Sequence, residues 1–411
     1  MSESADIDEG AARPATARFA RRKEAVLAAA IDVLNSEGLK GMTLADVAAR
    51  VGLTTTSVTY YFRKKEILAA ECFLNGLGRF EAMVAKARRE ESLKDRLFRL
   101  LDLYLELHIR VRKGEESPMT FFGDIRALNE PYRAEVVEAY RQLFFNIRSL
   151  FEAPGYEHLD LLARSTRAHI LLEQLFWSVA WLPRYDIEDL PRIRERMFDI
   201  LANGLGTGAQ PWDPAPLAIA PRLGDPAVET FLQAATPLIN ERSYRGVSVT
   251  DIAARLNVTK GSFYHHMDAK DDVVVACFER TFEVIRAAQM AAQALPGDQW
   301  QALTSAVVAL VQRQVSPEGP LLRTSALQAL PPPLRTGVVL RGNRFAQRFA
   351  SMISDGAADG SIRIVDPFLA AQMVSASINA AADLVSWTGG LKPAAMADLY
   401  ARPALTGLLA K

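Results

Sequence analysis

Apolar residues recur along most of this chain with the spacing of an α-helix. The earliest clear example is Leu27, Ala30, Ile31 and Leu34, which occupy positions i, i+3, i+4 and i+7 and form one apolar stripe. No convincing run alternates between apolar and polar residues, which is the pattern of a half-buried strand. The chain is therefore predicted to be all-α.

Long amphipathic stretches follow in two series. Several begin with a proline, which is favoured in the first turn of a helix because its missing N–H has no partner there. In the first half, helices are expected near 66–90, 93–113, 117–127, 131–152, 157–182 and 190–204. In the second half, they are expected near 271–293, 298–315, 319–328, 332–357, 366–387 and 393–409.

The two series belong to an internal repeat. Residues 43–68 and 248–273 align without a gap at a spacing of 205 positions, and seven of the 26 pairs are identical. Average composition gives roughly one or two identities by chance. A repeat of this length indicates that one folded unit was duplicated. The identical residues in the first copy are Asp46, Ala48, Ala49, Arg50, Thr54, Ser57 and Lys65.

Each copy has the pattern of two short helices joined by a tight turn. Thr43 and Asp46 have the spacing of a capping box, which places the start of the first short helix. Gly52 is expected to end that helix in a left-handed conformation, which asparagine also tolerates. Thr54 is placed to cap the next helix. The second copy has Ser248, Asp251, Asn257 and Thr259 at these positions.

A helix-turn-helix of this composition is typical of proteins that bind double-stranded DNA, because its narrow second helix enters the major groove. The exposed face of that helix must offer donors, acceptors and methyl groups to the base edges. The predicted contacts of the first copy are Thr43, Thr54, Thr55, Thr56, Ser57, Thr59, Tyr60, Tyr61 and Lys65. Those of the second copy are Ser248, Thr259, Lys260, Gly261, Ser262, Tyr264, His265, His266 and Lys270.

Length and composition fit two globular domains. The chain has 411 residues, of which 49% are apolar and 23% are charged, enough for two domains of about 200 residues. It has no uncharged apolar run of about 18 residues and no apolar secretion signal at its start, so we expect a cytoplasmic, nucleoid-associated protein without a membrane contact. Cys72 and Cys277 are expected to be small buried residues, with redox sensing as the alternative.

The net charge is zero, but the charges are unevenly distributed. Four basic residues lie within 18–23, whereas the equivalent segment 223–228 has none. Residues 63–66 sum to +2, whereas 268–271 sum to −1. Because phosphate contacts supply most of the affinity for DNA, the first copy is expected to bind more tightly than the second.

Across a 48-residue stretch in each half, the chain resembles the TetR family of transcriptional regulators. The turn, the aromatic pair and the trailing lysine of TLADVAARVGLTTTSVTYYFRKKEIL carry the resemblance. The resemblance implies that the domain after each motif is a helical bundle that binds small molecules and dimerises. The first copy departs from the family pattern at Thr56 and Thr59, and the second departs at His266 and Met267.

The expected domain order follows from these segments. Pro237 falls inside the first helix of the second copy and is expected to kink or break it. The proline-rich linker is expected to be extended, with Trp212 and Leu217 pinning it to a domain surface. The predicted segments are a disordered arm at 1–17, a helix-turn-helix domain at 18–65, a regulatory domain at 66–204, the linker at 205–225, a diverged helix-turn-helix domain at 226–270 and a second regulatory domain at 271–411.

Two copies in one chain predict an intramolecular pseudo-dimer. Helix-turn-helix proteins usually bind two half-sites as a symmetric dimer. Here the closing helices 157–182 and 190–204 are expected to pack on 366–387 and 393–409. The operator then need not be palindromic, because the two copies differ. In the rival arrangement, two chains form a homodimer through one half each.

The space between helices of such a bundle is the expected site of an unknown small-molecule effector. The alternative is that an aromatic stripe at helical spacing belongs to the core or to the interface between halves. The two dispersed histidines do not indicate a metal, and no cofactor is expected. The candidates are Tyr104, His108, Phe121, Phe122, His169, Glu173, Trp177 and Trp181 in the first half, and Trp300, Asn379, Asp383 and Trp387 in the second.

The leading interpretation is a ligand-responsive transcriptional regulator, specifically a repressor. Effector binding is expected to lower operator affinity through a coupling of about 1–3 kcal/mol. The alternative is a ligand-sequestering or protein-interaction protein whose second helix-turn-helix no longer binds DNA. An enzyme is not expected, because the sequence has no phosphate-binding glycine loop, nucleophile elbow or metal-ligand spacing.

Overall fold

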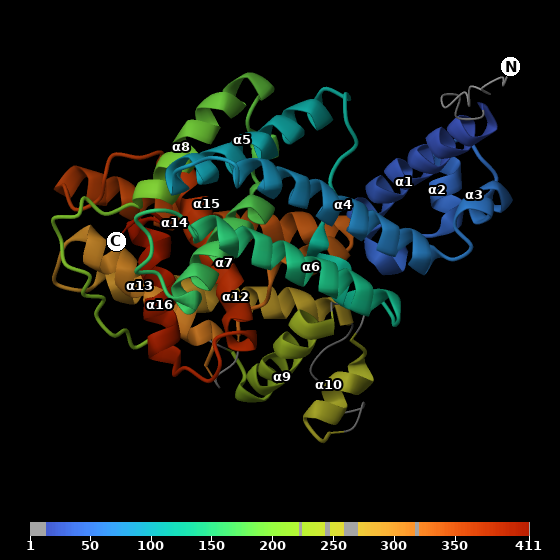
Figure 1. The fold of residues 1–411 in the computed structure, drawn as a ribbon. Coiled ribbons are helices and arrows are strands. Elements are labelled where there is room, and N and C mark those ends of the chain that lie inside the picture. Colours follow the sequence, from blue (N-terminus) through green and yellow to red (C-terminus); the bar gives the residue numbers. More distant parts are fainter. Residues whose placement is uncertain (1–13, 222–223, 243–246, 259–269, 317–319, 411) are drawn as a thin grey trace, which may run out of the picture. The chain divides into compact units, whose positions relative to one another are not determined.

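The computed structural model of the chain describes residues 14–221, 224–242, 247–258, 270–316 and 320–410. Within these ranges helices dominate and no strand is present, which confirms the all-α prediction (Figure 1). An isolated β-bridge joins Gly206 to Ile362. The chain divides into two compact units, a first unit of residues 1–76 and 117–136 and a second unit of residues 77–116 and 137–411.

The first unit holds the first helix-turn-helix. Helix α1 begins at Pro14, so residues 14–17 are helical and were wrongly assigned to a disordered arm, since proline is favoured in a first turn. The predicted stop at Gly38 is confirmed by its φ of 68°. The elements are α1 (Pro14–Gly41), α2 (Leu44–Arg50), α3 (Thr55–Tyr61), the start of α4 (Lys65–Ala87), η1 (Phe122–Ala127) and the start of α6 (Tyr132–Arg148).

The second unit holds the rest of α4 and α6 together with both bundles. Its first-half elements are α5 (Leu93–Arg112), η2 (Ser149–Phe151), α7 (Leu161–Ser178), η3 (Leu182–Arg184), η4 (Ile187–Asp189) and α8 (Leu190–Asn203). Its second-half elements are α9 (Pro226–Arg242), α10 (Val249–Arg255), α12 (Lys270–Gln293), α13 (Gln299–Gln314), η6 (Thr324–Ala329), α14 (Pro332–Asp359), α15 (Pro367–Ala380), η7 (Ala381–Ser386) and α16 (Pro393–Thr406).

The α-helices expected at 117–127 and 319–328 are absent from the described residues: segments 118–121 and 320–323 are non-helical and lead into the 3₁₀ helices η1 and η6. An asparagine from the first helix of each half, α1 or α9, holds each segment in the same way. Asn35 donates to Met119 O (2.8 Å) and accepts from Phe121 N (2.9 Å). Asn240 donates to Leu321 O (3.0 Å) and accepts from Arg323 N (2.9 Å). These bonds satisfy backbone groups that an α-helix would otherwise pair, so the amphipathic pattern alone was misleading.

Pro237 does not break the helix as one of the two expectations had it, because α9 continues through it to Arg242. The neighbouring residues Ala235, Leu238 and Ile239 are buried in the core that α9 shares with α10 and α12. Burial of this face holds the helix together although the proline lacks an N–H.

The halves pack against each other within the second unit, as expected for an intramolecular pseudo-dimer. Helix α7 of the first half contacts α15 and α16 of the second half. Gln174 donates to Met373 O (2.8 Å) and to Ser377 Oγ (3.0 Å). The Nε2 atom of His169 lies 3.2 Å from Ala380 O. These buried polar groups therefore have partners in the other half.

The ends of α8 and α16 exchange backbone hydrogen bonds reciprocally. Leu205 N donates to Leu405 O (2.7 Å), and Leu408 N donates to Leu201 O (2.7 Å). Gly204 (φ 69°) and Gly407 (φ 99°) make this approach possible because a Cβ on either one would lie within 2.4 Å of the opposing backbone. Reciprocal contacts of this kind are typical of a two-fold interface.

The linker lies along the second half, and Trp212 anchors it as predicted. Its indole N–H donates to Asp398 Oδ1 (2.5 Å), and its ring meets Trp300 edge-on at 6.2 Å. Ala215 N donates to Ser305 Oγ (2.9 Å) further along. One segment of the described chain, Pro367–Ser386, is long and apolar enough to cross a membrane, but 67% of it is buried inside the protein.

Candidate nucleic-acid interface

The capping residues predicted for the first helix-turn-helix form the expected bonds. Thr43 Oγ1 accepts from Asp46 N (3.1 Å) at the start of α2. Gly52 takes the left-handed conformation with φ 63° after α2. Thr54 Oγ1 accepts from Ser57 N (3.2 Å) at the start of α3. Local sequence therefore fixes the turn between α2 and α3.

Helix α3 turns Val58 into the core and leaves a polar face exposed. Val58 is fully buried, whereas Tyr60 is 75% exposed. Thr55 and Thr56 are exposed and make no side-chain hydrogen bond among the described residues. The hydroxyl of Thr59 donates to Thr56 O (2.8 Å). Thr55, Thr56 and Tyr60 are consequently the side chains of α3 best placed to contact a base edge.

An aromatic cluster that the sequence analysis missed joins the basic start of α1 to the end of α3. Phe19 meets Tyr61 at 4.9 Å and Tyr60 at 5.9 Å between ring centroids, and the two tyrosines meet at 5.4 Å. The only available signal was an isolated aromatic residue inside a basic segment. The cluster places the basic start of α1 beside the exposed face of α3.

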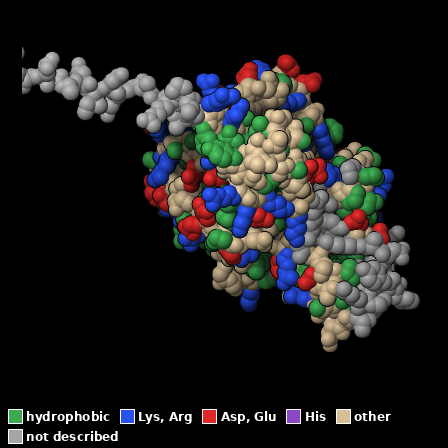
Figure 2. Space-filling model, turned by 90° about the vertical axis from the view of Figure 1, so that its right-hand side faces the viewer, with side chains coloured by type: hydrophobic (Ala, Val, Ile, Leu, Met, Phe, Trp, Pro, Cys, Tyr) green, Lys and Arg blue, Asp and Glu red, His purple; other side chains and the backbone are tan. Residues whose placement is uncertain are grey.

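Exposed cations lie on the first turns of α1 and directly after α3 in the chain. They make no ion pair among the described residues, unlike Arg79, Arg194 and Arg280 of the second unit. Lysine and arginine side chains are visible as separate blue clusters on the face drawn in Figure 2. Lys23 is half-buried, with its ammonium 5.4 Å from the centre of the Phe62 ring. The exposed cations are Arg18, Arg21, Arg22, Arg63 and Lys64.

Lys65, a predicted DNA contact, has partners inside the protein. Its ammonium donates to Leu39 O (3.4 Å) and Met42 O (3.3 Å), which are carbonyls at the end of α1. An ammonium that satisfies these carbonyls stabilises the fold and is less available to a phosphate. The neighbouring Lys64 is exposed and without such partners.

Lys65→Met is therefore expected to lower the free energy of unfolding by about 1–2 kcal/mol, because two carbonyls lose a charged donor. Urea denaturation followed by circular dichroism measures this change. Lys64→Met is the matched control and is expected to change stability by less than about 0.5 kcal/mol. A reversed order of the two variants would contradict this role of Lys65.

The second helix-turn-helix is described as far as its turn. Ser248 and Asp251 form a complete capping box, and the Ser248 hydroxyl is the main cause of a lowered Asp251 pKa. Asn257 has φ 55°, the left-handed conformation that was predicted for it. Thr259, Lys260, Gly261, Ser262, Tyr264, His265 and His266 lie outside the described residues, as does the side chain of Lys270.

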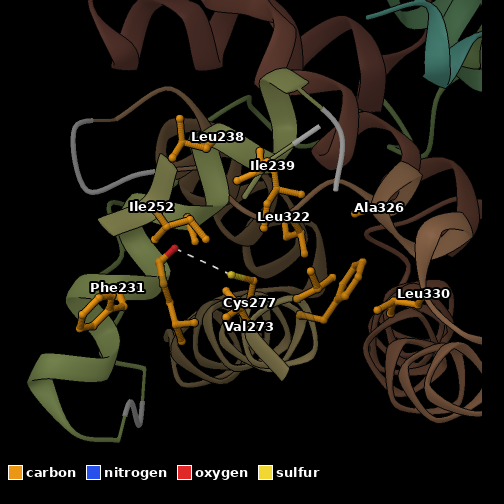
Figure 3. Close-up of a cluster of buried hydrophobic side chains, with 14 of the residues drawn as sticks. Phe231, Leu238, Ile239, Ile252, Val273, Cys277, Leu322, Ala326 and Leu330 are labelled. Atoms are coloured by element: carbon orange, nitrogen blue, oxygen red, sulfur yellow. Dashed lines mark hydrogen bonds between the residues drawn. The ribbon is translucent and has the colours of Figure 1, made fainter. Parts of the chain in front are cut away.

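The second helix-turn-helix has a buried apolar core that joins α9, α10 and α12 (Figure 3). Phe231, Ile252 and Val273 line it, and Cys277 Sγ lies 3.9 Å from Leu232 O. Burial raises the pKa of the Cys277 thiol to about 12, and it raises that of Cys72 equally. Both thiols are therefore protonated and inaccessible, which favours the packing role over redox sensing.

The described part of the second helix-turn-helix carries little free positive charge. Arg242 lies 3.6 Å from Asp251, and the first copy has Glu37 at the position of this arginine. Arg280 is buried and pairs with Glu229 at 2.7 Å. Arg255 is exposed and is the described counterpart of Arg50. The sequence predicts less positive charge near the second helix-turn-helix than near the first, and these side chains follow the same trend.

The aromatic candidates of the first half mostly belong to the core. The Tyr104 hydroxyl donates to Leu175 O (2.8 Å), and burial raises its pKa. His169 packs against Trp387 of the second half at 5.6 Å, and Trp181 is buried. Phe121, Phe122 and Glu173 are half-buried. The alternative reading of the stripe, a core and an interface, therefore fits His169, Trp181 and Trp387.

The candidates of the second half divide between structural contacts and a cavity. Asp383 accepts two bonds from Arg323 (2.9 and 2.5 Å), and Trp300 lies over Gly206. Asn379, by contrast, lines a small cavity together with Trp177 from the first half. These two residues were predicted to belong to separate sites, one in each half. The other lining residues were not predicted, among them the aromatic Phe278, Phe282 and Phe345.

His108 is a buried base in the first-half bundle. Burial, followed by the charges of Arg112 and Arg79, lowers its pKa from 6.5 to about 4. The folded protein therefore holds neutral His108, whereas the unfolded chain takes up a proton below pH 6.5. Stability is complete above pH 6.5 and falls as the pH drops from 6.5 toward 4.

The wild type is expected to lose roughly 2 kcal/mol of unfolding free energy at this site between pH 7 and pH 5. His108→Gln should lose correspondingly less over the same interval, because glutamine does not titrate. Urea titrations of both proteins at the two pH values measure the difference. Equal losses would show that His108 does not titrate as described.

The comparisons with known proteins match both halves. The family described as "Bacterial regulatory proteins, tetR family" matches residues 26–72 and 231–277. The family described as "Tetracyclin repressor-like, C-terminal domain" matches residues 296–408. The Transposon Tn10 TetC protein of Escherichia coli is 34% identical over 59 residues, which are 14% of this chain and 30% of that protein. The match thus spans less than a third of that relative's length.

Among solved structures, apo AibR is 20% identical and has a TM-score of 0.37, with 44% of this chain and 98% of that chain covered. PfmR from Thermus thermophilus is 23% identical and has a TM-score of 0.34, with 43% and 98% covered. KstR2 of Mycobacterium tuberculosis is 17% identical and has a TM-score of 0.36, with 46% and 97% covered. Each solved chain covers less than half of this chain.

Proposed function

Because the chain belongs to the TetR family of bacterial regulatory proteins, we propose that it represses transcription by binding an operator mainly through its first helix-turn-helix. A small-molecule effector then lowers the operator affinity. One observation carries the DNA contact: Thr55, Thr56 and Tyr60 of α3 are exposed, and ring contacts of Phe19 join the cation-rich start of α1 to the end of this helix. Hydroxyls and methyl groups suit base edges, and cations suit phosphates.

The two copies bind unequal half-sites in this proposal. The packing of α7 against α15 and α16 supports a single chain that presents both copies to one operator. The contact of the second copy is then intramolecular and benefits from a high effective concentration. The pairing of Arg242 with Asp251 supports a weaker contact by the second copy.

The effector acts on the packing of the two halves. A ligand changes operator affinity only if it binds the two arrangements of the halves with different affinity. A coupling of about 1–3 kcal/mol corresponds to roughly a 5–150-fold change in operator affinity. Reporter expression from a promoter that contains the operator tests repression: it should rise when the gene for the chain is deleted.

The DNA contact is tested with the purified full chain and duplexes selected from a random library. Fluorescence anisotropy is expected to give sequence-preferring binding at about 0.15 M salt with a strongly negative salt slope. A hydroxyl-radical footprint should show two unequally protected segments about 34–36 Å apart. Mass measurement of the complex should give one chain for each operator.

The ion pair between Arg242 and Asp251 also favours a second candidate, in which the second helix-turn-helix binds no DNA and serves a ligand-sequestering or protein-interaction role. In that case the footprint has a single protected segment, and Arg255→Gln leaves it unchanged. Binding without sequence preference at moderate salt would exclude the repressor altogether.

A further inference from the structure

A cavity of about 30 Å³ lies in the second unit, where the first half meets the second. Helices α12, α13, α14 and α15 supply most of its lining, and Trp177 of α7 comes from the first half. Phe282 and Phe345, whose ring centroids are 5.7 Å apart, form an aromatic side of it. The cavity therefore brings both halves into contact with whatever occupies it.

The lining favours an uncharged occupant that carries one hydrogen-bond acceptor. It contains no charged side chain. The Nε1 atom of Trp177 is buried and has no hydrogen-bond partner among the described residues. Gln314, in contrast, donates to Ile378 O (2.9 Å) and accepts from Leu321 N (2.9 Å). A buried indole N–H without a partner is costly, so an acceptor on the occupant would satisfy it.

The corresponding positions of the first half can be identified by register. Helices α4 and α12 begin 205 positions apart, at Lys65 and Lys270, so Gly76 corresponds to Thr281 and Phe80 to Ile285. The 3₁₀ helices η1 and η6 begin at Phe122 and Thr324, which the equivalent asparagine contacts bring into correspondence.

Aromatic side chains occupy two of these positions in the first half, Phe80 and Phe122. In the first unit, the Phe122 ring lies so close to Gly76 that a Cβ there would be 3.2 Å from it. In the second unit, Phe80 is fully buried between Tyr104 (5.8 Å) and Phe176 (5.6 Å). Phe122 and Phe80 are thus each larger than their counterparts in the second half, Thr324 and Ile285.

The second half has Thr281 and Thr324 where the first has Gly76 and Phe122. The Thr281 hydroxyl donates to Cys277 O (2.9 Å) and accepts from Leu322 N (2.9 Å), so backbone groups hold it. Thr324 bonds to Asn379 Oδ1 through its N–H (3.2 Å). Neither threonine places a ring in the cavity.

We propose that each chain binds one uncharged aromatic molecule bearing a carbonyl-type acceptor, in the second half only, with the Trp177 indole N–H as its donor. This inference rests on the effector-responsive function proposed above. Because a cavity of about 30 Å³ holds little more than a water molecule, the rings of Phe282 and Phe345 turn aside to admit the ligand. The ligand then touches α7 and the second-half bundle together and changes how they pack.

The test uses three probes of similar size with the full chain. Acetophenone carries the ring and the acceptor, ethylbenzene lacks the acceptor, and benzoate carries a charge. Calorimetry is expected to give one acetophenone per chain, with ethylbenzene binding at least about tenfold more weakly and benzoate not at all. Trp177→Phe should reduce acetophenone affinity to the level of ethylbenzene. Equal affinities for acetophenone and ethylbenzene, no binding of acetophenone, or two sites per chain would overturn the proposal.

An exchange of residues between the halves tests whether the ligand binds in the second-half cavity. The double variant Thr281→Gly with Thr324→Phe carries the first-half pair in the second half and should abolish acetophenone binding. Ile285→Phe fills the cavity independently, should the double variant not fold. The control Gly76→Thr with Phe122→Thr should retain second-half binding. If a folded variant with a filled cavity still bound acetophenone with undiminished affinity, the proposed location of the binding site would be overturned. Operator affinity without any probe is measured separately, so loss of the repressor function and loss of the cavity are distinguishable.

Discussion

Gly204→Ala is expected to lower the free energy of unfolding of the second unit by more than about 3 kcal/mol. Gly204 has φ 69°, which costs any other residue about 1–2 kcal/mol. A Cβ at this position would also lie 2.3 Å from Leu405 O and from the carbonyl carbon of Thr406. Since those atoms are backbone, relief requires α8 and α16 to separate, which breaks their reciprocal hydrogen bonds.

Gly208→Ala provides the matched control. Gly208 also has a left-handed φ, 79°, but a Cβ there meets nothing within 4 Å. The unfolding free energy that Gly208→Ala loses should be limited to the conformational cost of about 1–2 kcal/mol. Gly407→Ala should resemble Gly204→Ala, because its Cβ would lie 2.4 Å from Ala202 O. Urea denaturation monitored by tryptophan fluorescence measures all three, and equal effects of Gly204→Ala and Gly208→Ala would contradict a tight interface.

Replacing Arg63 and Lys64 together with glutamine is expected to reduce operator affinity at least about tenfold at low salt. Both side chains are exposed at the end of α3 and make no ion pair among the described residues. If each neutralises one phosphate, the log-log salt slope should become less negative by about 1.8. Glutamine keeps the length and polarity of the side chains, so stability should change little. Anisotropy titrations at four or more salt concentrations measure the slope.

The control for this variant lies in the second half. Arg255→Gln removes an exposed cation from the end of α10, and Arg50→Gln removes its equivalent from α2. The first copy carries most of the affinity in the proposed function, so Arg255→Gln should change the slope less than Arg50→Gln. A larger effect at Arg255 would reverse the assigned order of the two copies.

The turn between the two short helices was predictable because its contacts are local. Thr43 bonds to a residue three positions away, and so does Thr54. Asn257 adopts its left-handed conformation because of its own side chain. Interactions that close within one turn of helix can be identified from a single sequence without knowledge of tertiary contacts.

Contacts between distant segments were not predictable in the same way. Lys65 bonds to carbonyls 23 and 26 positions away, and nothing in a helix-start lysine indicates these partners. Trp177 meets Asn379 only because the two halves fold onto each other. The non-helical segments before η1 and η6 depend on Asn35 and Asn240, which lie more than 80 positions away in the chain. None of these contacts can be predicted without knowledge of the tertiary structure.

The closing helices of the two halves are engaged with each other through α7, α15 and α16. A regulator assembled from separate subunits loses more than a proportionate share of its active form when its gene is expressed less. It also exchanges subunits with related proteins in the same cell. In the proposed arrangement of one chain per operator, both effects are avoided, so promoter output should follow gene dosage linearly and resist interference from paralogues.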